Sequence, residues 1–128
     1  MTKQCSVAVV GAGYWGRNLV RVYHEIGALK VVCDSNEMLL DRFTDQYHNL
    51  ETCLAFNDLL EREDIKALAI ATPAETHFTL AREALLAGKH VYVEKPLVLD
   101  ESEAEKLISL AEERNLTLMV GHLLQYHP

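Results

Sequence analysis

The sequence predicts an α/β domain, a doubly wound parallel sheet of about six strands with helices on both faces. First, short apolar runs alternate with longer segments whose apolar residues recur at helical spacing. Second, the joins between these segments are short, and no linker rich in serine, glycine or proline separates them. Third, the run Ala67–Ala71 (ALAIA) is apolar on both faces, as expected of a parallel strand between two helical layers.

The first half of the chain predicts two strand–helix units. A strand over Ser6–Val10 stops at a glycine, and a helix over Tyr14–Ile26 follows it and ends at Gly27. A second strand over Leu29–Cys33 ends in an aspartate, and a helix over residues 36–46 comes next.

The middle of the chain is less regular. Tyr47–Phe56 is ambiguous, and a short edge strand near Cys53 is one interpretation. Asn57 is expected to be the N-cap of a brief helix over Asp58–Glu61. The apolar strand Ala67–Ala71 follows and ends at a Thr-Pro dipeptide.

The second half repeats the strand–helix pattern. A helix over Thr76–Ala87 has Gly88 as its left-handed cap, and a strand over His90–Glu94 is stopped by Lys-Pro. A D-x-x-E capping signal opens a helix over residues 100–114, and a last strand covers Thr117–Val120.

Length and composition indicate one globular domain in the cytoplasm. The 128 residues can bury a core, and 49% hydrophobic with 24% charged residues is an ordinary globular balance. No apolar run approaches the roughly 20 residues that span a bilayer, and the start, MTKQCS, lacks the apolar stretch of a secretory signal. A net charge of −7 disfavours nucleic acid, whose binding needs a basic face. We therefore expect neither a membrane nor a nucleic-acid partner.

The cysteines indicate neither a disulfide framework nor a zinc site. Cys5, Cys33 and Cys53 are odd in number and share no C-x-x-C spacing. Cys5 and Cys33 lie beside or within predicted strands, where a free cysteine usually acts as a small buried hydrophobe.

The first strand is followed by glycines at G-x-G-x-x-G spacing, in the stretch VAVVGAGYWGRN. Gly11 permits a tight turn, Gly13 lets the backbone approach a diphosphate, and Gly16 lets helix and strand pack closely. The helix N-terminus that follows favours an anion. Tyr14 and Trp15 open this helix and are expected to border the same ligand. The alternative, a turn that binds nothing, is disfavoured by this strand–turn–helix context, which predicts a Rossmann-type dinucleotide site.

Asp34, at the end of the second strand, indicates which dinucleotide binds. A carboxylate there can accept hydrogen bonds from the adenosine ribose hydroxyls and would repel a 2′-phosphate. NAD is therefore favoured over NADP, although Ser35 beside it leaves NADP as the lesser alternative.

A second motif lies in ATPAETHFTLAREALLAGKHVYVEKPL, from Ala71 to Leu97. Together with GAGYWGRN it resembles the glucose-fructose oxidoreductase / inositol dehydrogenase / rhizopine catabolism family, written Gfo/Idh/MocA. In that family a strand ending A-T-P precedes a helix that begins near a histidine, and G-K-H-V-x-x-E-K-P follows. The matching positions here are Ala71, Thr72, Pro73, His77, Gly88, Lys89, His90, Val91, Glu94, Lys95 and Pro96.

The resemblance implies an NAD(P)-dependent oxidoreductase acting on sugars or polyols. By position, Thr72, Pro73 and His77 would border the cofactor's ribose and nicotinamide. Glu94 and Lys95 would lie near the nicotinamide ribose and the substrate hydroxyl, with Lys95 as the catalytic candidate.

The chemistry also asks for a group such as Lys95. Oxidation of an alcohol sends hydride to nicotinamide while the hydroxyl proton departs, so a base or a cation must lie within hydrogen-bond reach. Burial would lower the pKa of Lys95 and Glu94 would oppose that shift, which leaves the balance open. The alternatives are a solvated Lys95 and a His77 that only caps or packs, and His90 is expected to be structural.

The end of the chain, VGHLLQYHP, resembles a branch that oxidises nucleotide-linked sugars, such as UDP-N-acetylhexosamine, at the C3 hydroxyl. Leu124 and Gln125 stand where arginine is frequent in the family, and His122 and Gln125 are the candidate substrate contacts. His122 and His127 have no acidic or cysteine partner at ligand spacing, so no metal is expected.

Family members carry a second α/β domain that binds most of the substrate and mediates oligomers. Residues 1–128 are therefore expected to be the dinucleotide-binding domain, with the substrate domain absent from this chain. We expect a sugar or nucleotide-sugar substrate, a homo-oligomer of the full-length protein, and weak or no activity of the fragment. A noncatalytic NAD(P)-binding regulatory module of the same fold is the alternative, and Lys95 in E-K-P favours the enzyme.

Overall fold

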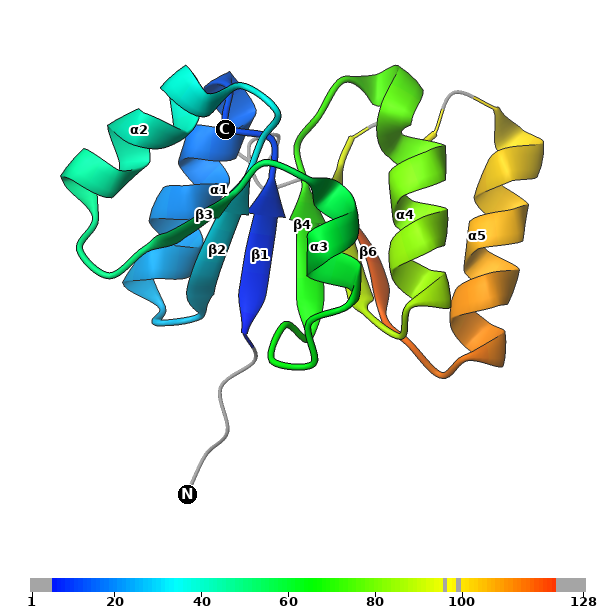
Figure 1. Ribbon diagram of the computed structural model, residues 1–128. Coiled ribbons are helices and arrows are strands. Elements are labelled where there is room, and N and C mark those ends of the chain that lie inside the picture. The colour runs from blue at the N-terminus through cyan, green and yellow to red at the C-terminus, as the bar shows by residue number, and fades with distance from the viewer. Residues whose placement is uncertain (1–5, 96, 99, 122–128) are drawn as a thin grey trace.

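The computed structural model describes residues 6–95, 97, 98 and 100–121. These residues form an α/β domain with a parallel sheet at its centre (Figure 1). In chain order the elements are β1 (Val7–Val10), α1 (Tyr14–Glu25), β2 (Leu29–Cys33), α2 (Glu37–Gln46), β3 (Glu51–Cys53), α3 (Phe56–Leu60), β4 (Ala67–Ile70), the 3₁₀ turn η1 (Ala74–Thr76), α4 (His77–Leu86), β5 (His90–Glu94), α5 (Glu101–Glu113) and β6 (Leu118–Gly121).

The six strands lie in the order β3-β2-β1-β4-β5-β6, and every neighbouring pair is parallel. The order reverses direction between β1 and β4, so the carboxyl ends of these two strands flank a topological switch point. Ligands bind at such a point in open α/β sheets. The predicted doubly wound sheet is confirmed.

Two apolar cores lie on opposite faces of the sheet. Along β1, Ala8 and Val10 face one core while Val7 and Val9 face the other, because successive strand side chains alternate. The first core is closed by α3, α4 and α5, and the second by α1 and α2. This arrangement explains why the central strands are apolar on both faces.

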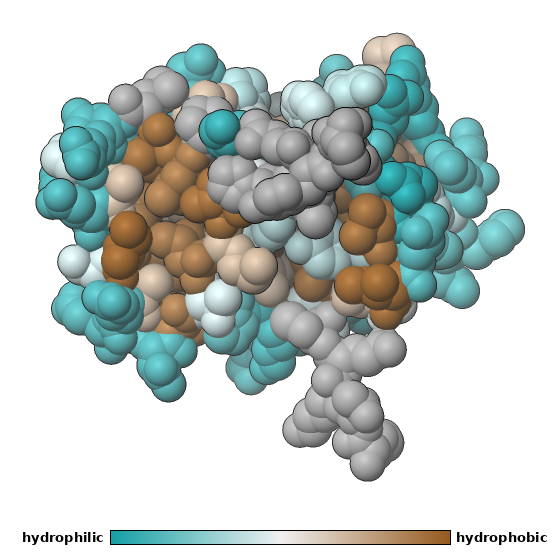
Figure 2. Space-filling model, turned by 180° about the vertical axis from the view of Figure 1, so that it is seen from behind, coloured by the Kyte–Doolittle hydropathy of each residue, from teal (hydrophilic) through white to brown (hydrophobic). Residues whose placement is uncertain are grey.

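The layer of α1 and α2 covers only part of its face. Seen from behind, hydrophobic side chains gather on the half of the molecule that holds β5 and β6 (Figure 2). Met119 on β6 is 56% exposed, and its partner in the strand register is Tyr92, which packs against the second core. Within the described residues, no helix combines the length and the apolar character needed to span a membrane.

Most predicted boundaries agree with the structure within one or two residues. Gly27 and Gly88 have φ of 76° and 83°, so both occupy the left-handed region after a helix. Asp100 is the N-cap of α5 and accepts a hydrogen bond from the Ser102 amide. The ambiguous segment before α3 contains the edge strand β3.

The brief helix in the middle of the chain was wrongly placed. It begins at Phe56 after Ala55 as N-cap, and Asn57 lies inside it. Phe56 packs against the first core and Leu59 is fully buried in it. Burial of these apolar side chains thus outweighs the capping preference of asparagine, which contributes only about 1 kcal/mol.

Candidate functional site

The turn after β1 takes a conformation that only glycine adopts readily. Gly11 has φ of +106°, and its amide donates to the Cys33 carbonyl at 2.8 Å. A Cβ on Gly11 would lie 2.9 Å from the backbone carbonyl of Ala71. The turn is therefore held between the ends of β2 and β4.

The other two glycines have opposite surroundings. A Cβ on Gly16 would lie 1.8 Å from the Gly11 carbonyl oxygen, so only glycine lets α1 start this close to the turn. A Cβ on Gly13 would meet nothing within 4 Å, so its side of the turn is open space. The geometry expected of each glycine is present.

The N-terminus of α1 offers unpaired backbone donors beside that open space. Gly13 is the N-cap, no side chain caps the helix, and its first turn contains no acidic residue. Amide groups in this position attract an anion. Tyr14 and Trp15 lie on the surface of the first turn, 64% and 47% exposed, with their rings packed edge to face.

Asp34 is bonded directly to the glycine turn. Its Oδ2 accepts a hydrogen bond from the Ala12 amide at 2.7 Å, and its Oδ1 accepts one from the Asn36 amide at 2.8 Å. Sequence reasoning placed Asp34 near a ribose and missed this contact. The contact could have been expected, because the first two strands are neighbours and parallel neighbours end at the same edge of a sheet, which brings Asp34 close to the turn after the first strand.

A cleft of about 350 Å³ opens beside the turn and Asp34. It brings together five of the predicted cofactor residues, which are Gly11, Asp34, Ser35, Thr72 and Pro73. Its apolar walls include Leu54, Phe56 and Leu80, which the sequence did not single out. Leu54 and Phe56 were missed because their segment had no clear pattern. Apolar walls with a polar edge suit a flat heterocycle joined to a ribose.

The turn after β4 is fixed by two residues that follow the A-T-P motif, one at the end of η1 and one at the start of α4. The Thr76 hydroxyl lies 2.6 Å from the Thr72 hydroxyl and donates to the Pro73 carbonyl. His77 is only 2% exposed, and its Nε2 lies 2.8 Å from the Thr72 carbonyl oxygen. His77 is not among the residues that line the cleft.

Glu94 and Lys95 lie at the end of β5, two strands away from β1 but at the same carboxyl edge of the sheet. The Glu94 carboxylate accepts a hydrogen bond from the Tyr92 hydroxyl at 3.3 Å. Burial, aided by the charge of Glu94, raises the pKa of Tyr92. The Tyr92 hydroxyl also packs on Gly121, where a Cβ would lie 2.3 Å from it. Neither Glu94 nor Lys95 lines the 350 Å³ cleft.

Lys89, which belongs to the same motif, lies at the opposite edge of the sheet. It is 5% exposed, and its Nζ donates to the carbonyls of Arg62 and Ile65. Burial lowers its pKa. Lys89 therefore supports the loop before β4 and does not face the cofactor edge.

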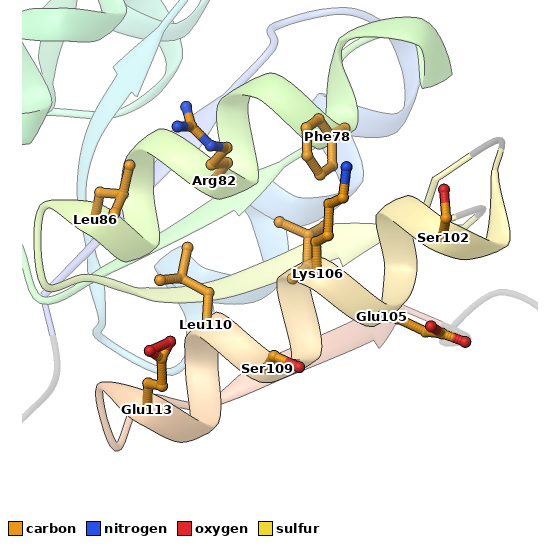
Figure 3. A pocket seen from close by; sticks show the side chains of 10 residues that line it. Phe78, Arg82, Leu86, Ser102, Glu105, Lys106, Ser109, Leu110 and Glu113 are labelled. Atoms are coloured by element: carbon orange, nitrogen blue, oxygen red, sulfur yellow. The ribbon is translucent and has the colours of Figure 1, made fainter.

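Other features lie apart from this site. A larger groove of about 570 Å³ runs between α4 and α5, with Phe78 and Arg82 on one side and Lys106 and Leu110 on the other (Figure 3). It contains none of the predicted site residues. Among the described residues, no cluster of three acidic, histidine or cysteine side chains could hold a metal. His122, Gln125 and Pro96 lie outside the described residues.

Comparison with known proteins finds an oxidoreductase family and relatives that are named as sugar-nucleotide oxidoreductases. A family model described as an oxidoreductase family with an NAD-binding Rossmann fold, GFO_IDH_MocA, matches residues 5–122. UDP-N-acetylglucosamine 3-dehydrogenase of Acidithiobacillus ferrooxidans is 40% identical over 122 residues, covering 94% of this chain and 37% of that protein. dTDP-3,4-didehydro-2,6-dideoxy-alpha-D-glucose 3-reductase of Actinomadura kijaniata is 41% identical over 87 residues, covering 68% of this chain and 26% of that protein.

Solved structures agree in fold. GenD2 from gentamicin A biosynthesis, in complex with NAD, has a TM-score of 0.91 and 30% identity, covering all of this chain and 37% of that chain. KijD10, a 3-ketoreductase from Actinomadura kijaniata with NADP and TDP-benzene, has a TM-score of 0.88 and 30% identity, covering 98% and 39% of the two chains. The chain thus spans well under half the length of these relatives.

Proposed function

The chain belongs to the Gfo/Idh/MocA oxidoreductase family as its NAD-binding Rossmann domain, and we propose that it is the cofactor-binding portion of an NAD-dependent sugar or sugar-nucleotide dehydrogenase. One observation carries this proposal: Gly11 and Asp34 line the same cleft, and the open space at Gly13 lies on the same turn. The names of two relatives, one acting on a UDP-sugar and one on a dTDP-sugar, support a nucleotide-sugar substrate.

The residues present are compatible with the diphosphate, ribose and adenine of a dinucleotide. The amides at the start of α1 would hold the diphosphate, because they face open space without a side-chain cap. Asp34 would hold the adenosine ribose, since each carboxylate oxygen that accepts one backbone amide retains a second lone pair. The apolar walls at Leu54 and Phe56 would cover the adenine.

The nicotinamide, which accepts or gives hydride when bound, would extend from the turn toward β5 along the carboxyl edge. Lys95 would then exchange the proton of the substrate hydroxyl or stabilise the alkoxide. Glu94, whose carboxylate accepts a hydrogen bond from Tyr92, would lie near the nicotinamide ribose.

NAD is proposed over NADP because Asp34 presents a carboxylate where a 2′-phosphate would lie. Relatives of known structure bind each cofactor, GenD2 with NAD and KijD10 with NADP. The cytoplasmic location and the homo-oligomer of the whole protein stay predictions.

Isothermal titration of the chain with NAD and with NADP tests this function. We expect NAD to bind with a Kd in the micromolar range or weaker, and NADP to bind at least about tenfold more weakly, a difference of about 1.4 kcal/mol. Asp34→Ser should reduce the difference between the Kd values for NADP and NAD. Absence of binding by both dinucleotides would refute the proposal, and equal binding would refute the choice of NAD.

Catalysis requires the whole protein and a second test. Lys95→Met is expected to leave NAD binding to this chain within about threefold, because Lys95 lies outside the 350 Å³ cleft. The same change in the full-length protein should reduce nucleotide-sugar oxidation at least about a hundredfold, as loss of a general acid or base usually does. A noncatalytic module would show NAD binding and no such oxidation.

A further inference from the structure

Two cysteines occupy paired positions beside the cofactor cleft. Cys33 is the last residue of β2 and Cys53 the last of β3, and they are direct partners in the parallel register. Adjacent strands lie about 4.8 Å apart, within the Cα separation of roughly 4.4–6.8 Å that a disulfide spans. Both side chains contact the same core, so they leave the sheet on one face.

The surroundings of the two thiols also bear on their reaction. The Cys53 thiol donates a hydrogen bond to the Ala55 carbonyl at 3.0 Å, and after burial the proximity of Cys53 is the next cause that raises the pKa of the Cys33 thiol. Both cysteines are reduced. Because the two residues are register partners on one face of the sheet, we expect side-chain rotation to bring their sulfur atoms to bonding distance without a new strand pairing.

The pair separates two cavities. Cys33 lines the 350 Å³ cleft, while Cys53 lines a second cavity of about 450 Å³ with Asp58 and Arg62. Leu54 contributes to both. A small reagent can thus reach Cys53 from the second cavity without entering the cofactor cleft.

We propose that Cys33 and Cys53 form a thiol–disulfide exchange site, which a low-molecular-weight disulfide converts reversibly into a cross-link between β2 and β3. The Cys53 thiolate attacks one sulfur of the reagent, forms a mixed disulfide and releases one thiolate. Cys33 then gives its proton to the released thiolate, attacks the Cys53 sulfur as a thiolate and displaces the second thiolate. The two cysteines are oxidised, the reagent is reduced to two thiols, and these take up the two cysteine protons.

The order of the two steps follows from burial. Burial raises the pKa of the Cys33 thiol to about 12, so Cys33 is protonated at neutral pH and the half-buried Cys53 reacts first. The second cavity also contains Glu37, Asp41 and Asp58. These carboxylates favour a cationic reagent such as cystamine over an anionic one such as oxidised glutathione.

The cross-link would also affect the cleft. Asp34 follows Cys33 directly, and its amide donates to the Cys53 carbonyl at 3.0 Å. Rotation of the Cys33 side chain into the cross-link changes the cleft wall beside Asp34, so we expect oxidation to weaken NAD binding several-fold. This last expectation rests on the proposed function, which NAD titration of the reduced chain tests separately.

The experiment treats the reduced chain with cystamine, in a Cys5→Ser background that removes the third cysteine. Trypsin cleaves after Lys30, Arg42 and Arg62, so Cys33 and Cys53 fall in separate peptides, 31–42 and 43–62. We expect mass spectrometry to find these two peptides linked, and dithiothreitol to separate them. Oxidised glutathione at the same concentration should produce the link at least about tenfold more slowly.

Two variants control for the mechanism, with circular dichroism to verify that each is folded. In Cys33→Ala the second step is impossible, so a cysteamine adduct should accumulate on Cys53. In Cys53→Ser the buried Cys33 should react at least about tenfold more slowly than the pair. A stable adduct on Cys53 while Cys33 is still present, or a link that forms only in denaturant, would overturn the proposal. A link that leaves NAD affinity unchanged would overturn the coupling to the cleft.

Discussion

The carboxylate of Asp34 accepts a 2.7 Å hydrogen bond from the backbone amide of Ala12, and this bond joins the end of β2 to the glycine turn. The residue that is proposed to select the cofactor therefore also fixes the loop that would hold its diphosphate. A change at Asp34 should affect both the stability of the apo chain and the choice of dinucleotide.

Asp34→Ala is expected to lower the free energy of unfolding by about 1–3 kcal/mol, because the Ala12 amide loses its acceptor. Asp34→Asn keeps an oxygen acceptor and should cost less. Urea denaturation measures both. We also expect Asp34→Ala to weaken NAD and NADP together, whereas Asp34→Asn should mainly improve NADP relative to NAD. An alanine variant as stable as the wild type would contradict this double role.

Gly13 and Gly16 offer a matched pair of substitutions. Gly16→Ala should destabilise the fold by about 3 kcal/mol, because its Cβ would lie 1.8 Å from the Gly11 carbonyl oxygen. Gly13→Ala should change stability by no more than about 1 kcal/mol, since its Cβ meets nothing within 4 Å and Gly13 has φ of −80°.

NAD binding, unlike stability, should be sensitive to the substitution at Gly13. We expect folded Gly13→Ala to lose NAD binding, because the added methyl group occupies the space proposed for the diphosphate. Thermal unfolding followed by titration with NAD gives both readouts. If Gly13→Ala binds NAD as the wild type does, the diphosphate does not lie there.

Lys89→Met should destabilise the chain by about 1–3 kcal/mol, because the carbonyls of Arg62 and Ile65 lose the ammonium that donates to them. Lys66→Met is the control, since Lys66 is exposed one residue after Ile65. NAD affinity of folded Lys89→Met should match that of the wild type, because Lys89 lies at the amino edge of the sheet. A selective loss of NAD binding would show that its role is not structural.

Acid should weaken an ion-pair network at that same edge. Arg62 bonds Glu51 at 2.9 Å and Asp64 at 2.7 Å, which lowers the pKa of both carboxyls and brings Asp64 from its ordinary 3.8 to about 2. Carboxyls with a lowered native pKa stabilise the fold above their ordinary pKa and lose that effect as the pH falls toward the native value.

The stability difference between wild type and Arg62→Gln should therefore be largest above about pH 5 and shrink toward pH 2. The difference should be small even at neutral pH, because the pairs are largely exposed. Urea denaturation at several pH values measures it. A difference that stays constant across this range would contradict the assignment.

The sequence by itself determined the succession of strands and helices along the chain, the tight turn at Gly11 and the fold class. These features depend on local patterns: the apolar period of each segment, the position of each glycine and the short joins between segments. The brief helix α3 was misplaced because its start depends on burial of Phe56 and Leu59, which no local signal reveals.

Only the tertiary structure decided which side chains meet. Asp34 and Ala12 are 22 residues apart, and Lys89 and Ile65 are 24 apart, so their contacts arise when crossover helices bring parallel strands together. The strand register that pairs Cys33 with Cys53 is likewise set by packing of the whole sheet. Local patterns determine what each segment becomes, whereas the contacts that build the site depend on how the two helical layers fix the strands against one another.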